Sequence, residues 1–257
     1  MGNTENFFLN YEGNLKQMSL DKQEKWIMDS IVSTAGCVYN SFYIMNHVTK
    51  KMVYVSENSY IFGGYSSAEI MESGSAFFNE VIPQEELTVL TRVAKENLKV
   101  FNAFSKEKRG NLVCSYDFHL SGKGTSKILL NQKTVPLGID DEGKVWISLC
   151  IVSLSPRKEF GHYVIYESAE TVQETSHFYI KYDLKLQKWE EIPSFTLSRT
   201  EKDVLALSAQ GFTMEEISQK ICKSVDAVKW YKRKLFEKMK VGSITEAFAL
   251  AIEQRLI

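Results

Sequence analysis

The clearest pattern of apolar and polar positions lies in roughly the last sixty residues, where apolar side chains recur at helical spacing between polar caps. A serine or threonine followed three residues later by glutamate is the pattern of a capping box, and it occurs at Ser198, Thr213 and Ser243. Ser224 supplies a fourth N-cap. The caps therefore predict four helices, over 199–210, 214–221, 225–239 and 244–255.

The connections between these predicted helices indicate a helix-turn-helix. Gly211 and Gly242 fall where the first and third helices are expected to end, because glycine tolerates the left-handed conformation found there. The second and third helices are joined only by Cys222, Lys223 and Ser224. Two short helices with a turn of this length are typical of DNA-binding domains.

The third predicted helix has one apolar face and one cationic face. Val228 and Leu235 lie on the apolar side of its helical wheel, whereas Lys229, Trp230 and Arg233 lie opposite. Such a helix fits the major groove of DNA. The alternative is a solvated basic face on an ordinary bundle helix, but an exposed tryptophan is costly unless it meets a partner, which favours a binding face.

Charge is distributed unevenly along the chain, although the net charge of its 257 residues is only −1. Residues 196–257 contain 11 basic and 8 acidic side chains, so the remainder of the chain is net negative. The excess of positive charge therefore lies in the segment that carries the predicted helix-turn-helix, as DNA binding requires.

Four motifs give this segment a family resemblance. They are Leu-Ser-Arg-Thr-Glu at 197–201, Glu-Ile-Ser at 216–218, Ser-Val-Asp-Ala-Val-Lys at 224–229 and Thr-Glu-Ala at 245–247. With these motifs, residues 197–248 resemble the LuxR-type helix-turn-helix domain. The sequence departs from the family pattern at Tyr231, where histidine is common, and at Ala227, where threonine is common.

The resemblance implies which residues meet DNA. In that family the third helix contacts base edges from the positions that Lys229, Trp230 and Arg233 occupy here. Placement alone adds further candidates, with phosphate contacts expected of the lysines. These additional DNA-binding candidates are Lys223, Ser224, Lys234 and Lys238.

The last predicted helix resembles the helix through which family members dimerise. Its candidate dimerisation residues are Ala247, Leu250 and Ala251. The alternative is that these side chains belong to the core of their own domain. The expected partners are thus double-stranded DNA and a second copy of the chain, with RNA polymerase as a further candidate.

The first two thirds of the chain predict a sheet with helices. Short β-prone runs at 42–45 and 52–55 flank a polar turn, helical spacing covers 84–105, and three longer strands are expected. Those strands are 112–120, 127–137 and 145–154. This order, with Tyr-Val-Ser-Glu at 54–57 and Gly-Tyr-Ser-Ser-Ala-Glu-Ile at 64–70, resembles a PAS sensor domain over residues 31–155.

The whole chain is expected to have an α+β fold. A helical extension over 1–30 precedes the PAS-like antiparallel sheet, and the LuxR-type domain of four helices occupies 194–257. Residues 156–193 are interpreted as a β-rich connector with two or three added strands. This connector is either a structured linker or a surface that couples the two domains.

The resemblance to PAS domains implies a small-molecule ligand, haem, flavin or simple dimerisation. No cofactor is evident, because the Asn-Cys-Arg-Phe element of photoactive flavin sites is missing, and His47 and His119 are each isolated in the sequence. Binding of a small molecule, whose identity the sequence does not give, remains an alternative for this domain. Cys37, Cys114, Cys150 and Cys222 have no metal-ligand spacing, so no metal site is expected and the thiols are interpreted as reduced.

The remaining features narrow the function. No run of 18 apolar residues is present, so no membrane span is expected, and the chain is interpreted as cytoplasmic. No phosphate-binding loop or nucleophile arrangement points to an enzyme. The sequence predicts a one-component transcription regulator. The alternative is a protein-interaction module whose helix-turn-helix no longer binds DNA.

Overall fold

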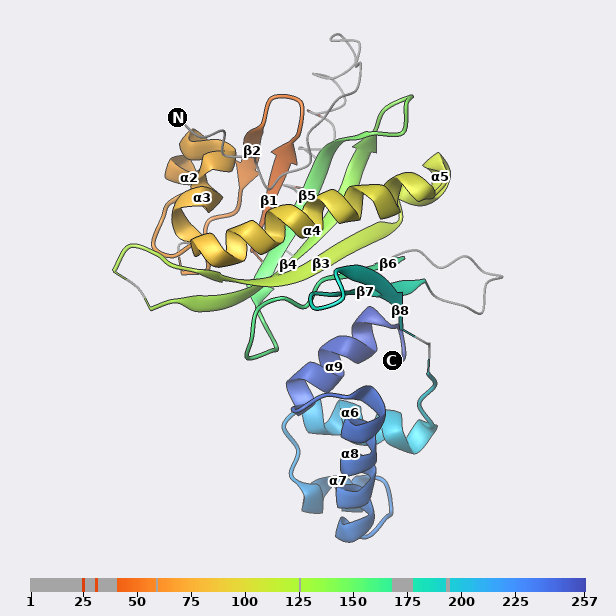
Figure 1. Ribbon diagram of the computed structural model, residues 1–257. Coiled ribbons are helices and arrows are strands. Elements are labelled where there is room, and N and C mark those ends of the chain that lie inside the picture. The colour runs from red at the N-terminus through yellow and green to blue at the C-terminus, as the bar shows by residue number, and fades with distance from the viewer. Residues whose placement is uncertain are drawn as a thin grey trace. The chain divides into compact units, whose positions relative to one another are not determined.

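The computed structural model divides the chain into two compact units (Figure 1). It describes residues 25, 31, 41–58, 60–124, 126–167, 178–192 and 195–257. Of these, 41–167 and 180–190 belong to the first unit, and 178–179 and 191–257 belong to the second. Nearly all of the predicted extension 1–30, and Cys37, lie outside the described residues.

One eight-stranded sheet runs through the described part of the first unit, in the order β2-β1-β5-β4-β3-β6-β7-β8. Five of its strand pairs are antiparallel, from β2 through to β6. The strands are β1 (Ser41–Asn46), β2 (Lys51–Val55), β3 (Leu112–Leu120), β4 (Ile128–Ile139), β5 (Val145–Leu154), β6 (Val164–Glu167), β7 (Tyr179–Asp183) and β8 (Lys188–Glu191). The predicted hairpin and the three long strands are confirmed to within about two residues, as expected of pattern-based boundaries.

Helices connect β2 to β3 and cover one face of the sheet (Figure 1). They are α2 (Ser67–Ser73), the 3₁₀ turn η1 (Gly74–Ala76), α3 (Phe77–Val81), α4 (Gln84–Ala103) and α5 (Lys106–Arg109). Ser66 begins α2 with a complete capping box to Glu69. The α+β fold expected from the sequence is thus the fold observed.

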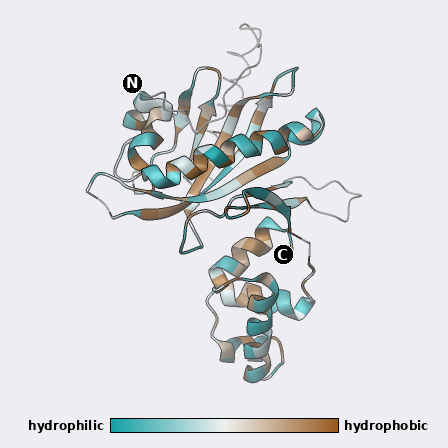
Figure 2. Ribbon diagram, viewed as in Figure 1, coloured by the Kyte–Doolittle hydropathy of each residue, from teal (hydrophilic) through white to brown (hydrophobic). Residues whose placement is uncertain are grey.

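The core of the first unit lies between these helices and the sheet. Phe78 and Leu90 from the helices pack in one cluster with Tyr43, Phe118 and Val152 from the strands. Figure 2 shows apolar residues along the central strands and a mixture of apolar and polar residues along α4. Because successive strand residues point to opposite faces, each strand contributes alternate side chains to this core.

The segment interpreted as a connector takes part in the same sheet. β6 pairs antiparallel with β3, with Leu112 opposite Glu167 and Ser115 opposite Val164. Tyr163, immediately before β6, is buried in the core cluster described above. Isolated short strands are only marginally stable, so pairing with β3 explains how β6 is stabilised.

The second unit contains the four predicted helices, and Ser198 and Thr213 make complete capping boxes with Glu201 and Glu216. The helices are α6 (Arg199–Ala209), α7 (Met214–Lys220), α8 (Val225–Met239) and α9 (Ile244–Glu253). In the described residues none of the helices of either unit has the length and apolar character needed to cross a membrane.

Two details of the helix ends differ from the expectation. Ser243 accepts the N–H of Glu246, but the Glu246 carboxylate accepts from the N–H of Gly242 instead of Ser243, so this capping box is incomplete. The residue that ends α8 in the left-handed conformation is Lys240, with φ of 53°, whereas Gly242 does not adopt it. The chain therefore turns two residues earlier than the glycine implied.

Removing one capping hydroxyl tests how much the helix starts contribute to stability. Ser198→Ala deletes the acceptor of the Glu201 N–H, and we expect a loss of about 1 kcal/mol of unfolding free energy. Hydrogen exchange of the α6 and α8 amides measures it. Ser208→Ala, the same change near the end of α6, is the control. An equal effect of both substitutions would contradict the capping role.

Candidate nucleic-acid interface

A short turn holds α8 against α7. Cys222 adopts φ of 53°, which reverses the chain direction, and the N–H of Lys223 donates to the Ser218 carbonyl at 3.0 Å. The hydroxyl of Ser224 then accepts the N–H of Ala227 at 3.2 Å and begins α8. These local bonds set the angle of α8, so the predicted helix-turn-helix is present.

Helix α8 is buried along one face only. Val228, Leu235 and Met239 are buried in the core of the second unit, as the helical wheel predicts. Lys229 and Arg233 are exposed on the other face. Packing thus fixes the helix in place while leaving its cationic side open to solvent.

Trp230 has two side-chain neighbours on that open face. The residue is 44% exposed, which is unusual for tryptophan. The ring lies edge-on to Tyr231 with centroids 5.0 Å apart, and the Lys234 ammonium lies 4.7 Å from its centroid. A cation over the ring and an aromatic edge restrict the rotamers of Trp230, so an apolar contact surface is presented between charges.

The cations of α8 pair only weakly within the helix. Lys229 Nζ lies 3.4 Å from Asp226, and Arg233 Nε lies 3.9 Å from Glu237, with at least 58% of each side chain exposed. Exposed pairs of this kind contribute at most about 1 kcal/mol. Both cations can therefore exchange their present partner for a phosphate or a base edge.

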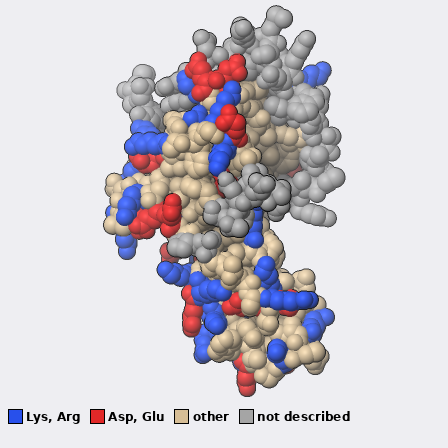
Figure 3. All heavy atoms as spheres, turned by 90° about the vertical axis from the view of Figure 1, so that its right-hand side faces the viewer, with Lys and Arg blue, Asp and Glu red and all other residues tan. Residues whose placement is uncertain are grey.

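Figure 3 shows Lys and Arg side chains gathered on the C-terminal unit among fewer acidic ones.

Lys238 differs from the other candidate lysines because it is bound within the unit. Its Nζ donates to the Thr196 carbonyl at 2.6 Å and to the Glu201 carboxylate at 3.4 Å. Burial alone would raise the pKa of Glu201, but hydrogen bonds from Ser198 and the Lys238 ammonium hold that pKa below its usual value. These contacts join α8 to the start of α6 and favour a structural role.

Lys223 and Ser224, at the start of α8, are exposed. In α9, by contrast, Ala247 and Ala251 are fully buried in the core of the second unit, and Leu250 packs against it while partly exposed. The exposed apolar residue of α9 is Ile252, at 49%. Dimerisation through α9 stays a prediction, and its exposed face is the part available for it.

His47 and His119 both have side-chain partners. His119 Nδ1 lies 2.8 Å from the buried carboxylate of Glu86, and His47 Nε2 lies 2.8 Å from the Ser148 hydroxyl. Within the described ranges no group of three or more His, Cys, Asp or Glu side chains could hold a metal ion.

Comparison with known families gives a match to the region that carries these helices. Residues 195–251 match the model of the family described as bacterial regulatory proteins, luxR family. This segment is a LuxR-type domain. The match covers α6, α7, α8 and most of α9, so the LuxR-type domain contains every candidate DNA-binding residue. No curated protein is similar enough in sequence to count as a relative of the chain.

Solved structures similar to the chain include three of VqmA. A structure of the Vibrio cholerae VqmA dimer without target DNA is 15% identical, covers 88% of both chains and has a TM-score of 0.33. The V. cholerae VqmA–ligand–DNA complex is 14% identical, with 88% and 87% covered and a TM-score of 0.33. The phage VqmA–DPO complex is 11% identical, with 91% and 89% covered and a TM-score of 0.29.

The hydrogen bonds of Lys238 allow a test of whether this side chain stabilises the fold or binds DNA. Lys238→Met should lower the unfolding free energy by about 1 kcal/mol, because hydrogen bonds to Thr196 and Glu201 are lost. The salt dependence of DNA affinity should be unchanged. Urea unfolding and DNA titration over a range of salt concentrations measure the two effects, with the exposed Lys202→Met in α6 as control. A shallower salt slope with unchanged stability would instead assign Lys238 to a phosphate.

Proposed function

We propose that the chain is a sequence-specific DNA-binding transcription regulator whose helix α8 enters the major groove. The observation that carries this proposal is the exposed cationic face of α8 within a LuxR-type domain. The groove is wide enough for one α-helix. The rigid attachment of α8 to α6 and α7 would present its outer face to DNA without rearrangement of the domain core.

The side chains of α8 suit different parts of the DNA surface. We assign Lys229 and Arg233 to the O6 and N7 acceptors of guanine and Trp230 to a thymine methyl group. We assign Lys223 and Ser224, at the exposed start of α8, to backbone phosphates, because the helix dipole also favours negative charge there. Lys234 we assign to the support of Trp230, because its ammonium already lies over the ring.

We propose that the first unit is a PAS-like domain that senses a signal or dimerises. The support is its element order, with two strands, short helices, the long helix α4 and three strands in succession. We include β6 and the residues 180–190 in this domain, because they continue its sheet. We propose that the active form is a cytoplasmic homodimer in which the α9 helices of the two copies are in contact. RNA polymerase is a further candidate partner.

Loss of the two exposed cations should abolish specific DNA binding. Lys229→Ala with Arg233→Ala should leave the protein folded, and each change alone should cost about 1–3 kcal/mol at one base position. DNA selected from a random pool by the native protein provides the probe for gel-shift titrations. Lys95→Ala with Lys99→Ala, an equal charge change at equal spacing on α4, is the matched control. A shift that persists unchanged in the α8 double variant would reject the assignment.

Trp230 should influence specificity more than overall affinity for DNA. Trp230→Ala removes an apolar group and no charge, so we expect a relaxed preference at one base position and an unchanged salt slope. Trp230→Phe should retain part of the preference. Competition between single-base variants of the selected site measures both. If the salt slope falls and the base preference stays, Trp230 acts by placing Lys234 rather than by contacting a base.

A further inference from the structure

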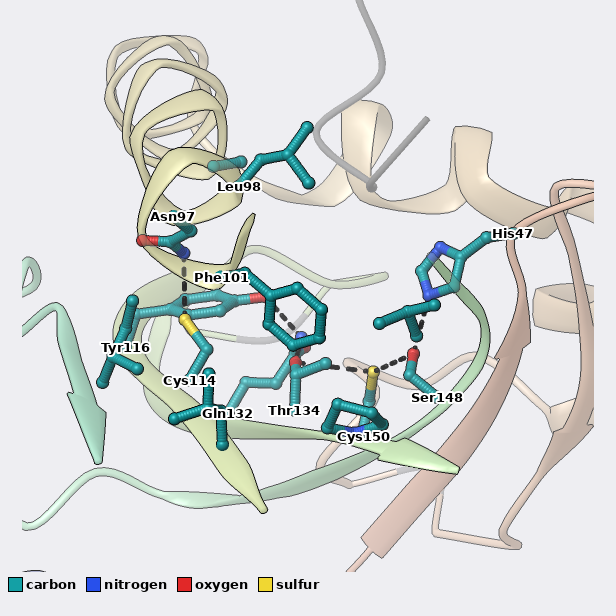
Figure 4. Close-up of a pocket in the computed structure, with 15 residues that line it drawn as sticks. His47, Asn97, Leu98, Phe101, Cys114, Tyr116, Gln132, Thr134, Ser148 and Cys150 are labelled. Atoms are coloured by element: carbon teal, nitrogen blue, oxygen red, sulfur yellow. Dashed lines mark hydrogen bonds between the residues drawn. The ribbon is translucent and has the colours of Figure 1, made fainter. Parts of the chain in front are cut away.

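A cavity of about 100 Å³ lies inside the first unit, between α4 and the central strands of the sheet (Figure 4). Leu98 and Phe101 of α4 form its roof, and His47 closes one end. Side chains of β3, β4 and β5 form its floor. The floor residues labelled in Figure 4 are Cys114, Tyr116, Gln132, Thr134, Ser148 and Cys150.

The floor carries a continuous chain of neutral polar groups. Gln132 is at its centre, because its amide nitrogen donates to the Tyr116 hydroxyl and, at 3.2 Å, to the Thr134 hydroxyl, while its amide oxygen accepts from Tyr43 at 2.9 Å. Gln132 is only 1% exposed. Buried amides and hydroxyls are retained where they have hydrogen-bond partners, and this arrangement holds them in a row along one wall of the cavity.

The chain of polar groups continues to the end of the cavity. Thr134 lies 3.7 Å from the Cys150 sulfur, which lies 3.9 Å from the Ser148 hydroxyl. Ser148 in turn lies 2.8 Å from His47 Nε2. Hydroxyl groups rotate to donate or accept, so this floor can meet either a donor or an acceptor on a bound molecule.

The cavity offers neither a compensating charge nor a reactive nucleophile. No Lys, Arg, Asp or Glu is among the described residues that line it. Burial raises the pKa of Cys114 to about 12 and also raises the pKa of Cys150, so both thiols stay protonated and weakly nucleophilic near neutral pH. A charged occupant would lose its hydration without an ionic partner, and a covalent adduct has no thiolate to form on.

We infer that this cavity binds an uncharged molecule of about one ring in size, with a hydrogen-bonding group facing the sheet and an apolar face against Leu98 and Phe101 of α4. Asn97, the polar α4 residue of the lining, donates to the Cys114 sulfur at 2.9 Å. The size follows from comparison with a dry apolar cavity of about 150 Å³ that holds benzene. The present cavity is smaller but only partly enclosed, so a single ring can extend beyond its opening. This inference rests on the proposed sensing role of the first unit.

Small ring compounds that differ in one feature test the class of ligand. Labelled phenol, benzene and benzoate are each equilibrated by dialysis against the full-length protein. We expect saturable binding of phenol and a weakening of about threefold or more for benzene, which lacks the hydroxyl. Benzoate should not bind, because its charge has no partner. The absence of saturable phenol binding, or benzoate binding as tight as that of phenol, would overturn the inference.

Two variants locate the binding. Thr134→Val keeps the side-chain shape but removes a floor hydroxyl, and phenol should bind about threefold or more weakly. Thr49→Val, in the exposed turn between β1 and β2, is the control and should bind phenol normally. Ala94→Leu, on the α4 side of the cavity, should block phenol by filling the space. Unchanged phenol binding in Ala94→Leu would place the probe elsewhere and overturn the inference.

One further measurement separates this inference from the proposed function. DNA affinity is titrated with and without saturating phenol. If phenol binds as expected but DNA affinity does not change, the ligand class is supported and the sensing role is not. If DNA binding by α8 fails while phenol binding persists, the regulator proposal fails and the class of ligand still holds.

Discussion

The burial of one face of α8 is the constraint on which the proposed DNA-binding surface depends. Val228, Leu235 and Met239 place that face in the core formed with the neighbouring helices. A helix of this length alone in water is only marginally stable. Tertiary packing therefore keeps α8 helical and at the same time determines which side chains remain outside. The positions of Lys229 and Arg233 at the surface are a direct result of where the apolar residues lie in the sequence.

The first unit uses buried polarity in a different way. Its core is mostly apolar, yet Gln132 and Ser148 are almost completely buried on one face of the sheet. Hydrogen bonds of Gln132 with Tyr116 and Tyr43, and of Ser148 with His47, offset the cost of removing these groups from water. A polar floor beneath an apolar helix can distinguish molecules by their hydrogen-bonding groups, because an occupant that leaves a buried partner unsatisfied binds less well. Selectivity would then reside mainly in the sheet, with Asn97 as the polar contribution of α4.

Local features could be predicted from the sequence, and contacts between distant residues could not. The caps at Ser198 and Thr213 depend on residues three positions apart, so their boxes were predicted correctly. Lys238 bonds to residues 37 and 42 positions away, and no local pattern indicates those partners. The cavity floor depends on strand register, which brings Gln132 opposite Tyr116. Even the expected connector joins the sheet through its register with β3.

The position of β1 in the sheet has a consequence for the order of folding during translation. β1 lies between β2 and β5, with Ser41 opposite Val152. The ribosome must therefore release the chain through β5 before the inner edge of β1 is paired, and until then that edge exposes unpaired backbone groups to other chains. The helices of the second unit contact partners that are much closer in the sequence. The inner edge of β1 is thus the part of the sheet that waits longest for its neighbour.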